Sequence, residues 1–524
     1  MQPQLSVTYN NNGGTGWMGE GWDLSVSCIS IDTRWGVPRF DNRKKSEVYM
    51  LDGKQLVTRG TAGFMQPLPY QGEWVNRYQS PKQFYMRVEG GFQKIMRYGN
   101  DPTNYYWKVT DKDGTVYYYD KPVDDDGVNG AGHVVKMEDE SGYAKSSYDD
   151  MGNVSENCST FVLPAEDNAY TFIMNTEYDT WGRTLSITYP DKERVSYAYG
   201  LGGELKSVAS SKNGNDKSLV HSIYYDKFGD RTAIYFGNGT TQHYAYNPTS
   251  RRLSNLQGRT STNALMQDII YEYDAVGNVT KTDNAAVAIG TLGGPYSCAY
   301  TYDHLNRLTA TNCQQGNVGY TEQRTYLDDG RIATYDLNGT RRGYTYNATQ
   351  PHTLSNIHTL PNRASDILFS FAWDAKGNMT AQNSPGGSQR NLIWDERNRM
   401  LGMVDNATSG NAAHYVYDAQ GERTFKLTGY SNHTDSGETS ETYVSLSNPT
   451  LYASPYLTAT ATGYTKHYFA GTERLASAIG NGGLADIGIV GSDVLADKLR
   501  ERDTLMKNLS CITFAKKRYL CAKL

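Results

Sequence analysis

Acidic residues recur along this chain at positions where a cation or an acid–base step could use them. In a recurring motif an Asp directly follows an aromatic residue, at Asp149, Asp179, Asp226, Asp274, Asp303, Asp374, Asp395 and Asp418. A calcium site needs several oxygen ligands around one ion, whereas each motif supplies a single Asp. Leu327, Gly200 and Asn347 take the same place in related motifs. We therefore interpret these Asp residues as caps of turns rather than as metal ligands.

Other residue types that carry out chemistry occur singly. The chain has no G-x-S-x-G, H-E-x-x-H or Walker A motif, the marks of nucleophilic, zinc-dependent and phosphate-binding sites. The nine His residues are scattered, and the six Cys residues form no C-x-x-C motif and have no His pair nearby. This pattern predicts neither a zinc site nor a disulfide framework. We expect no enzyme activity, and no catalytic, cofactor-binding or metal-binding residue.

Two further patterns have structural explanations. Asn-x-Ser/Thr sequences are abundant, at Asn153, Asn238, Asn278, Asn338, Asn347, Asn378 and Asn406. Four of them directly follow a Gly, so turn composition accounts for most of them. Trp-Asp pairs at Trp373 and Trp394 lie 21 residues apart, which is half the period of a propeller blade. They replace a Tyr-Asp pair of the motif, so we do not expect a propeller.

The aromatic motif is an internal repeat. Its twelve copies follow one another at steps of 20 to 30 residues. Their first residues are Tyr148, Tyr178, Tyr199, Tyr225, Tyr246, Tyr273, Tyr302, Tyr326, Tyr346, Trp373, Trp394 and Tyr417. A Gly or Asn stands four positions later in most copies, at Gly152, Gly182, Gly203, Gly229, Gly277, Asn306, Gly330, Gly377, Asn398 and Gly421. Periods of this length are typical of repeat architectures.

Each repeat predicts a strand, a tight turn and a returning strand. A second aromatic residue often stands two positions before the first, as in Tyr271 and Tyr273, and this spacing places both rings on one face of a strand. Asp at the first position and Gly at the fourth suit a type I turn. Asn306 and Asn398 replace the Gly, and Asn is the other residue that tolerates positive φ. Stacked hairpins bury a continuous aromatic face, and a long twisted sheet must curl.

The composition fits this all-β architecture. The 524 residues include 42 Tyr and 52 Gly, which favour strands and turns respectively. The formal charge of −5 and the absence of long runs of like charge give no sign of a nucleic-acid surface. No run of 18 apolar residues predicts a membrane span, and the N-terminus lacks the features of a signal peptide. We expect a spiral or hollow, partial β-shell with a short C-terminal helix.

The tandem Y-D-x-x-G-[RN]-[LVIM] units resemble the Rhs/YD-repeat family. This family includes bacterial polymorphic toxins, the B and C components of insecticidal toxin complexes and the YD shell of teneurins. The resemblance covers residues 148–475. Residues 6–41 are similar to the entry segment of virulence-plasmid B-type modules. The positions that fit are Tyr9, Asn10, Gly13, Gly14, Gly16, Gly19, Gly21, Trp22, Leu24, Ile29, Gly36, Pro38, Arg39 and Asp41.

The chain departs from the family near its C-terminus. Rhs proteins normally end the shell with a core segment that contains a P-x-D-P-x-G motif, followed by a variable toxin, and this sequence shows neither. Residues 493–509 predict a partly amphipathic helix before a short basic tail. We expect a truncated member with an entry segment at 1–140, a YD-repeat shell at 141–480, and a linker, helix and tail at 481–524. Any toxin activity would lie in a missing C-terminal domain.

Two functions from different classes remain open. The resemblance implies a shell that encloses a C-terminal toxin polypeptide or joins another shell component, in a secreted or cell-surface protein used in bacterial competition or host interaction. The alternative is an extracellular adhesion module that binds carbohydrate or protein through exposed rings. The direction of the rings of Tyr271, Tyr273, Trp373 and Trp394 separates the two, because rings packed on neighbouring repeats are not available to a sugar.

Overall fold

A computed structural model describes most of residues 27–491, and short strands within residues 7–24. The gaps between 27 and 491 are 35–37, 42–43, 60–74, 77–80, 100–101, 103, 121–131, 164–168, 291–292, 362–365, 385, 408 and 436–439. The predicted helix at 493–509 lies outside the described residues. In the part of the chain that is described, no helix is long and apolar enough to cross a membrane.

The N-terminal strands wrap around one apolar core. These strands are β5 (Ile29–Ile31), β7 (Tyr49–Leu51), β8 (Lys54–Val57), β10 (Lys82–Met86), β11 (Lys94–Tyr98), β12 (Tyr106–Thr110) and β13 (Val116–Tyr119). Trp107 is 1% exposed at the centre, with the rings of Tyr49 and Phe84 against it. A bridge between Cys28 and His133 joins the free edge of β5 to the next part of the sheet.

Three further short antiparallel pairs are formed by the N-terminal part of the sequence. They are β1 (Val7–Tyr9) with β4 (Trp22–Leu24), β2 (Thr15–Gly16) with β3 (Gly19–Glu20), and β6 (Lys44–Lys45) with β9 (Val75–Asn76). Of the entry-motif positions, Tyr9, Gly16, Gly19, Trp22 and Leu24 fall in these strands. Asn10, Gly13, Gly14, Gly21 and Gly36 lie outside the described residues.

The rest of the chain continues the same antiparallel sheet. Its strands are β14 (Val134–Asp139), β15 (Gly142–Tyr148), β16 (Val154–Val162), β17 (Ala169–Tyr178), β18 (Thr184–Thr188), β19 (Arg194–Tyr199), β20 (Leu205–Lys212), β21 (Asn215–Tyr225), β22 (Arg231–Phe236), β23 (Thr241–Tyr246), β24 (Leu253–Arg259), β25 (Leu265–Tyr273), β26 (Val279–Asn284), β27 (Tyr296–Tyr302), β28 (Leu308–Gln315), β29 (Val318–Tyr326), β30 (Ile332–Leu337), β31 (Thr340–Tyr346), β32 (Leu354–Thr359), β33 (Ile367–Trp373), β34 (Met379–Asn383), β35 (Gln389–Trp394), β36 (Met400–Asn406), β37 (Gly410–Tyr417), β38 (Arg423–Asp435), β39 (Ser440–Ser454), β40 (Leu457–Thr460), β41 (Gly463–Ala470) and β42 (Glu473–Asn481). From β10 to β42 each strand pairs with the next, so the sheet is a chain of hairpins. The expected all-β repeat shell is confirmed.

Every repeat bends the sheet at the same place. In all twelve copies the strand register shifts by one residue at the motif aromatic, as between Glu272 and Tyr273. Such bulges increase the local right-handed twist. A bulge in each hairpin therefore curls the sheet steadily in one direction.

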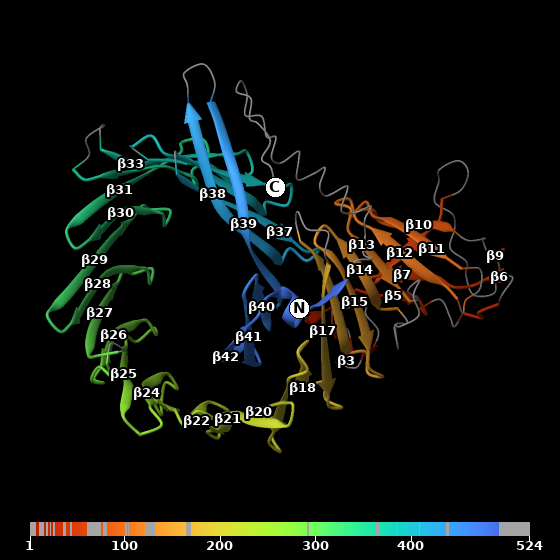
Figure 1. Ribbon diagram of the computed structural model, residues 1–524, viewed down its shortest axis with the longest axis horizontal. Coiled ribbons are helices and arrows are strands. Elements are labelled where there is room, and N and C mark those ends of the chain that lie inside the picture. The colour runs from red at the N-terminus through yellow and green to blue at the C-terminus, as the bar shows by residue number, and fades with distance from the viewer. Residues whose placement is uncertain are drawn as a thin grey trace.

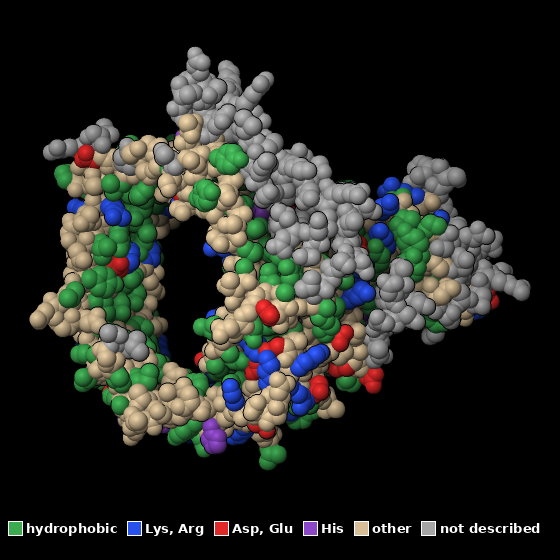
Figure 2. All heavy atoms as spheres, viewed as in Figure 1, with side chains coloured by type: hydrophobic (Ala, Val, Ile, Leu, Met, Phe, Trp, Pro, Cys, Tyr) green, Lys and Arg blue, Asp and Glu red, His purple; other side chains and the backbone are tan. Residues whose placement is uncertain are grey.

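The curled sheet forms a ring around a central opening (Figures 1 and 2). Its last strands return to the region where the shell begins, and β40–β42 lie on the inner side of the ring (Figure 1). After the short helix α1 (Leu484–Ile487), strand β43 (Ile489–Gly491) pairs with β17. Among the described strands no ladder joins β42 to β5, so the ring is closed by the β17–β43 ladder and by packing of late strands on early ones. Helix α1 precedes the segment where the sequence predicts a helix.

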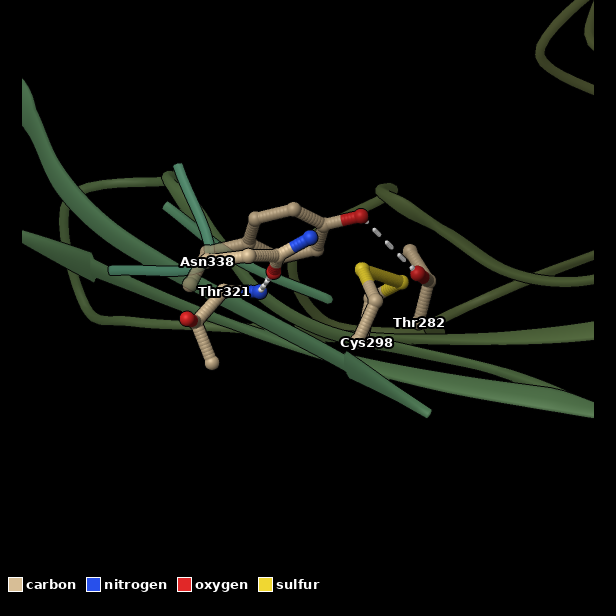
Figure 3. The surroundings of a disulfide bond; sticks show 6 residues. Thr282, Cys298, Thr321 and Asn338 are labelled. Carbon is tan, nitrogen blue, oxygen red and sulfur yellow. Dashed lines mark hydrogen bonds between the residues drawn. A yellow bond between two sulfur atoms is a disulfide. The ribbon is translucent and has the colours of Figure 1, made fainter. Parts of the chain in front are cut away.

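The ring wall contains a disulfide that the sequence analysis did not predict. Cys298 of β27 and Cys313 of β28 are opposite each other in register and are joined by a disulfide (Figure 3). The expectation of no disulfide framework is therefore wrong for this pair. The residues are 15 apart in sequence, without a C-x-x-C spacing, and only the hairpin register brings the two side chains together.

Candidate functional site

In most repeats an Asp at the first turn position caps the turn. The Asp274 carboxylate accepts hydrogen bonds from the backbone N–H groups of Val276, Gly277 and Asn278, at 3.1, 2.7 and 2.8 Å. The Asn278 side-chain amide donates to the other carboxylate oxygen, and this bond lowers the pKa of Asp274 most strongly. Asp179, Asp226, Asp303, Asp374, Asp395 and Asp418 cap their turns in the same way. Each of these carboxylates therefore accepts hydrogen bonds from the backbone of its own turn.

The fourth turn position has positive φ wherever the motif carries Gly or Asn. Gly277 has φ 110°, and Gly182, Gly229, Gly330, Gly377 and Gly421 have φ between 73° and 89°. Asn306 and Asn398 both have φ 61°, within the left-handed region that Asn tolerates. Sequence reasoning from Asp, Gly and Asn therefore located these turns.

In eleven of the twelve repeats the motif aromatic donates a hydrogen bond to the first residue of the strand that precedes its own. The Tyr273 hydroxyl donates to the backbone carbonyl of Leu253, the first residue of the preceding return strand, at 2.7 Å. Equivalent bonds run from Tyr148, Tyr199, Tyr225, Tyr246, Tyr302, Tyr326, Tyr346 and Tyr417. The indole N–H groups of Trp373 and Trp394 donate to Leu354 and Met379, both at 2.7 Å.

Sequence reasoning missed this bond, although the signal was present. All twelve motif aromatics are Tyr or Trp and none is Phe. Tyr and Trp each carry a donor at the far end of the ring, and Phe has none. Two positions earlier, where no such bond is required, Phe371 occurs. Tyr178 is the motif aromatic for which no such bond to a preceding repeat is observed among the described residues.

Arginines after the turns join neighbouring repeats along the rim. Arg307 donates to its own cap Asp303 at 2.7 Å, and its guanidinium lies 4.5 Å from the ring centre of Tyr326 in the next repeat. Arg183 makes the same pair of contacts with Asp179 and Tyr199. A cation held over a ring face contributes about 0.5–1 kcal/mol at an exposed site. The repeats are thus linked by ring-to-carbonyl bonds and by arginines stacked on rings.

A buried charged cluster lies where late strands of the ring meet early ones. We call this contact, between β41 and the β18–β19 turn with β20, the first seam. Lys466 of β41 is 4% exposed and pairs with Asp191, at 2.7 Å, and with Glu193. The Tyr468 hydroxyl donates to Glu193 at 3.0 Å. Lys212 of β20 also pairs with Asp191, and these cations hold the pKa of Asp191 below its usual value despite burial. The two buried carboxylates are therefore compensated from both sides of the seam.

Apolar packing surrounds this cluster. Tyr468 lies in a core with Tyr189, Tyr197 and residues of β18–β22, and Tyr189 donates to the His467 carbonyl at 2.8 Å. Since β41 lies on the inner side of the ring (Figure 1), the face of β18–β22 that packs on Tyr468 and carries Tyr197 and Tyr225 is the inner face. One continuous sheet carries that face through the later repeats. A second core joins Phe161 and Phe172 to Phe425, Leu451 and residues of α1.

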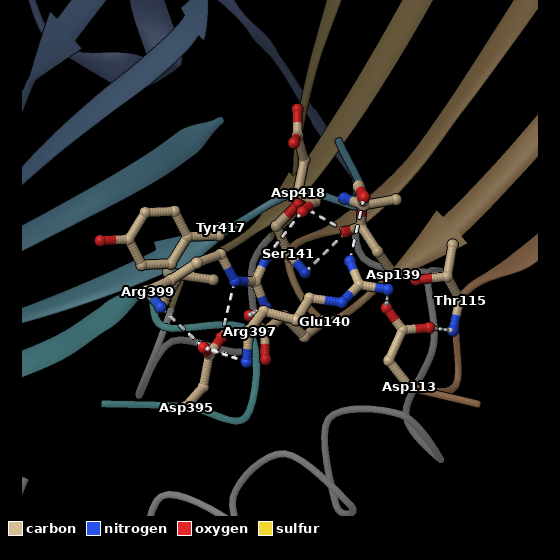
Figure 4. A network of polar contacts seen from close by, with 12 residues as sticks. Asp113, Thr115, Asp139, Glu140, Ser141, Asp395, Arg397, Arg399, Tyr417 and Asp418 are labelled. Carbon is tan, nitrogen blue, oxygen red and sulfur yellow. Dashed lines mark hydrogen bonds and ion pairs between the residues drawn. The ribbon is translucent and has the colours of Figure 1, made fainter. Parts of the chain in front are cut away.

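A second seam joins the β14–β15 turn to the turn of the last repeat (Figure 4). Asp139 accepts a hydrogen bond from the Ala419 N–H at 2.9 Å, and Arg397 pairs with Asp113 of the entry strands. Burial raises the pKa of Asp418 to about 6, and the charge of Asp139 adds to the shift. Burial also raises the pKa of Asp139 and of Glu140, while Arg399 opposes the effect at Glu140.

The described residues show little that would bind a metal or small molecule. Within them, no group of three His, Cys, Asp or Glu side chains could hold a metal ion. A polar cavity of about 180 Å³ lies between the β34–β35 and β36–β37 hairpins, and the Arg390–Asp405 ion pair lines it. Tyr271, Tyr273, Trp373 and Trp394 are half-buried, and the polar ring atoms of the last three are bonded to neighbouring repeats.

Several known proteins are similar in sequence to parts of this chain. The family model of the Salmonella virulence plasmid 65kDa B protein, SpvB, matches residues 1–169. Toxin subunit YenC2 of Yersinia entomophaga is 24% identical over 292 residues, and toxin subunit YenC1 is 27% identical over 284. These matches cover 49% and 48% of this chain but only 30% and 29% of the two relatives.

The fold has a counterpart among solved structures. The Photorhabdus luminescens Tc holotoxin pore structure aligns with a TM-score of 0.54 and 16% identity, over 87% of this chain and 25% of that one. This likeness concerns the fold alone. The repeats, the sequence matches and the fold together support an Rhs/YD-repeat, toxin-complex-like protein with an SpvB-type N-terminal segment.

Proposed function

We propose that this chain is a structural component of a toxin complex, in which the YD-repeat ring is the wall of a shell that encloses a polypeptide. The observation that carries the proposal is the self-closed ring around an open centre (Figure 2). A ring closed by the buried Lys466 cluster and two apolar cores maintains an enclosed space without a bound partner. In this proposal residues 1–140 are the entry segment and 141–480 form the wall.

The chemistry of the inner wall supports a polypeptide as the enclosed material. Half-buried Tyr rings on the inner face combine apolar area with polar edges. Such a surface tolerates an unfolded chain of mixed sequence without binding any one segment tightly. The chain spans about a third of the length of the toxin subunits that it matches. We propose that the wall encloses the polypeptide together with a further shell component, and that the complex acts outside the producing cell.

The adhesion alternative is disfavoured by the rings themselves. A carbohydrate site needs a ring face open to solvent, with polar neighbours free to bond the sugar hydroxyls. Trp373 and Trp394 are half-buried, and each indole N–H is bonded within the wall. We therefore do not assign an adhesive role to the aromatic rings of the repeats.

A protease-protection experiment tests enclosure. An unfolded reporter segment is fused after Leu524 of the full chain, and its cleavage by trypsin is compared with that of the free reporter. Enclosure predicts cleavage slowed at least about tenfold, because only an opened shell exposes the segment. The matched control is the same fusion carrying Lys466→Ala, which weakens the first seam and should restore cleavage. Equal cleavage rates for the fused and the free reporter would overturn the proposal.

A further inference from the structure

Strand β42 ends the hairpin chain with one edge unpaired by any described strand. Residues Gly463–Asn481 form the β41–β42 hairpin, and β41 is the only strand in register with β42. Alternate residues of β42 therefore direct N–H and C=O groups away from β41. The next described strand, β43, pairs with β17 instead. An edge of this kind is a template for another strand.

The composition of β42 does not protect this edge. Proteins usually block a free edge with Lys, Pro or a very short strand. The nine residues of β42 have their charges at the first two positions, Glu473 and Arg474, and the remainder, LASAIGN, has no charge and no Pro. Ile479 is 85% exposed, so an apolar side chain projects beside the free edge. Ala476 and Ala478 pack on the core of the first seam and hold the strand in place.

The position of β42 determines what can reach it. Strands β40–β42 lie on the inner side of the ring and border the central opening (Figure 1). A second copy of the protein cannot enter the central opening, because the whole ring is wider than the opening within it (Figure 2). An extended chain is narrow enough to lie along one strand.

We propose that the free edge of β42 binds an extended polypeptide segment inside the shell by strand addition. This inference rests on the proposed enclosing function and gives the enclosed chain a specific point of attachment. Main-chain hydrogen bonds supply the affinity, so many sequences are accepted, and the exposed Ile479 favours a segment with apolar alternate residues. The bound segment adds one strand to the sheet and shields the edge from other chains.

Peptide binding to the full chain tests the inference. The probe is a fluorescein-labelled peptide of alternating Thr and Val, and the control is the same peptide N-methylated at alternate residues. N-methylation removes the donors of one peptide edge and leaves the side chains unchanged. Strand addition predicts saturable binding of the probe, reduced at least about tenfold by N-methylation. It also predicts that the probe slows hydrogen exchange in Glu473–Asn481.

A pair of protein variants locates the binding on β42. Ile479→Lys places a charge beside the edge and should weaken probe binding about tenfold. Val318→Lys introduces the same charge at a 74% exposed position in β29 and should leave binding unaltered. Failure of the probe to bind, equal binding of the N-methylated peptide, or protection elsewhere in the ring would overturn the inference. If the fused reporter is protected from trypsin in that case, the enclosing function stands without this attachment site.

Discussion

The hydroxyl of Tyr273 donates a 2.7 Å hydrogen bond to the backbone carbonyl of Leu253, one repeat earlier in the chain. The same bond recurs in eleven of the twelve repeats, with the indole N–H in the two Trp copies. It joins a side chain of one hairpin to the backbone of the hairpin before it, in addition to the hydrogen bonds of the sheet ladder. Each of these repeats therefore uses the polar end of the ring as well as its apolar face.

Replacing Tyr273 with Phe removes only the hydroxyl. Since the Leu253 carbonyl loses a partner, we expect Tyr273→Phe to lower the free energy of unfolding by about 0.5–1.5 kcal/mol. The matched control is Tyr271→Phe, because Phe371 already occupies the equivalent place in another repeat. Urea denaturation of both variants measures the difference. Identical midpoints would show that the bond makes no net contribution.

The positive φ at the fourth turn position predicts a second, larger effect. Gly277 has φ 110°, which a β-branched residue adopts only with strain, so Gly277→Val should destabilise by about 1–3 kcal/mol. A Cβ atom there would also lie 2.7 Å from the Arg252 guanidinium, which would have to move. Asn306→Gly keeps an allowed conformation at φ 61° and loses only the exposed bond that Asn306 accepts from Asn278, so it should lower the melting temperature less than Gly277→Val does. Thermal unfolding followed by circular dichroism distinguishes the two, and an unshifted Gly277→Val variant would contradict the strain argument.

The repeat was predictable from the sequence because local chemistry determines it. The preferences that determine it act within a few residues. Asp274 and Gly277 favour a tight turn, and the spacing of Tyr271 and Tyr273 places both rings on one strand face. These preferences give the hairpin, its turn and the strand face that carries the paired rings, but not whether that face points into or out of the shell. A sheet of many such hairpins has to curl, and that consequence also follows from the sequence.

Contacts between distant parts of the chain were not predictable in this way. Lys466 meets Asp191 across 275 residues, and nothing in either local sequence marks the pairing. Their proximity depends on the summed curvature of every repeat between them, which no single motif encodes. The Cys298–Cys313 disulfide is an intermediate case, because it follows from the register of one hairpin. A pairing rule applied to the predicted strands, rather than a search for Cys spacing motifs, could have found it.

The first seam should be sensitive to loss of its buried cation. Lys466→Ala leaves Asp191 and Glu193 buried without that partner, and removal of one member of a buried pair costs about 3–5 kcal/mol. Lys281→Ala removes a similar pair, with Asp283, at a half-exposed site and should cost at most about 1 kcal/mol. Urea denaturation measures both changes, and limited proteolysis should show new cleavage in β40–β42 for Lys466→Ala alone. A Lys466→Ala variant with the stability of the Lys281→Ala variant would mean that the ring does not depend on this cluster.

The disulfide should stabilise the wall opposite the seams. A cross-link that closes a loop of 15 residues contributes roughly 3 kcal/mol in the chain-entropy model, and less where the hairpin already restrains the unfolded chain. We expect reduction by dithiothreitol to lower the melting temperature of the wild-type chain. The double variant Cys298→Ala, Cys313→Ala should melt at the same temperature with and without the reductant. A wild-type melting temperature that does not respond to reduction would contradict a stabilising role.

The second seam should lose stability as the pH rises through the titration of Asp418. Burial and the charge of Asp139 raise the pKa of Asp418 in the folded chain to about 6, above its usual value near 4. Between these two values the folded state retains a proton that the unfolded state has released, so stability falls as pH increases and levels off above about pH 6. Asp418→Asn keeps an oxygen for the N–H groups of Gln420 and Glu422 but cannot ionise. The variant should therefore equal the wild type near pH 4 and exceed it at pH 7.5 by about 1–3 kcal/mol, as measured by urea denaturation across this range. A difference between the two proteins that does not change with pH would show that Asp418 titrates as an ordinary surface carboxyl.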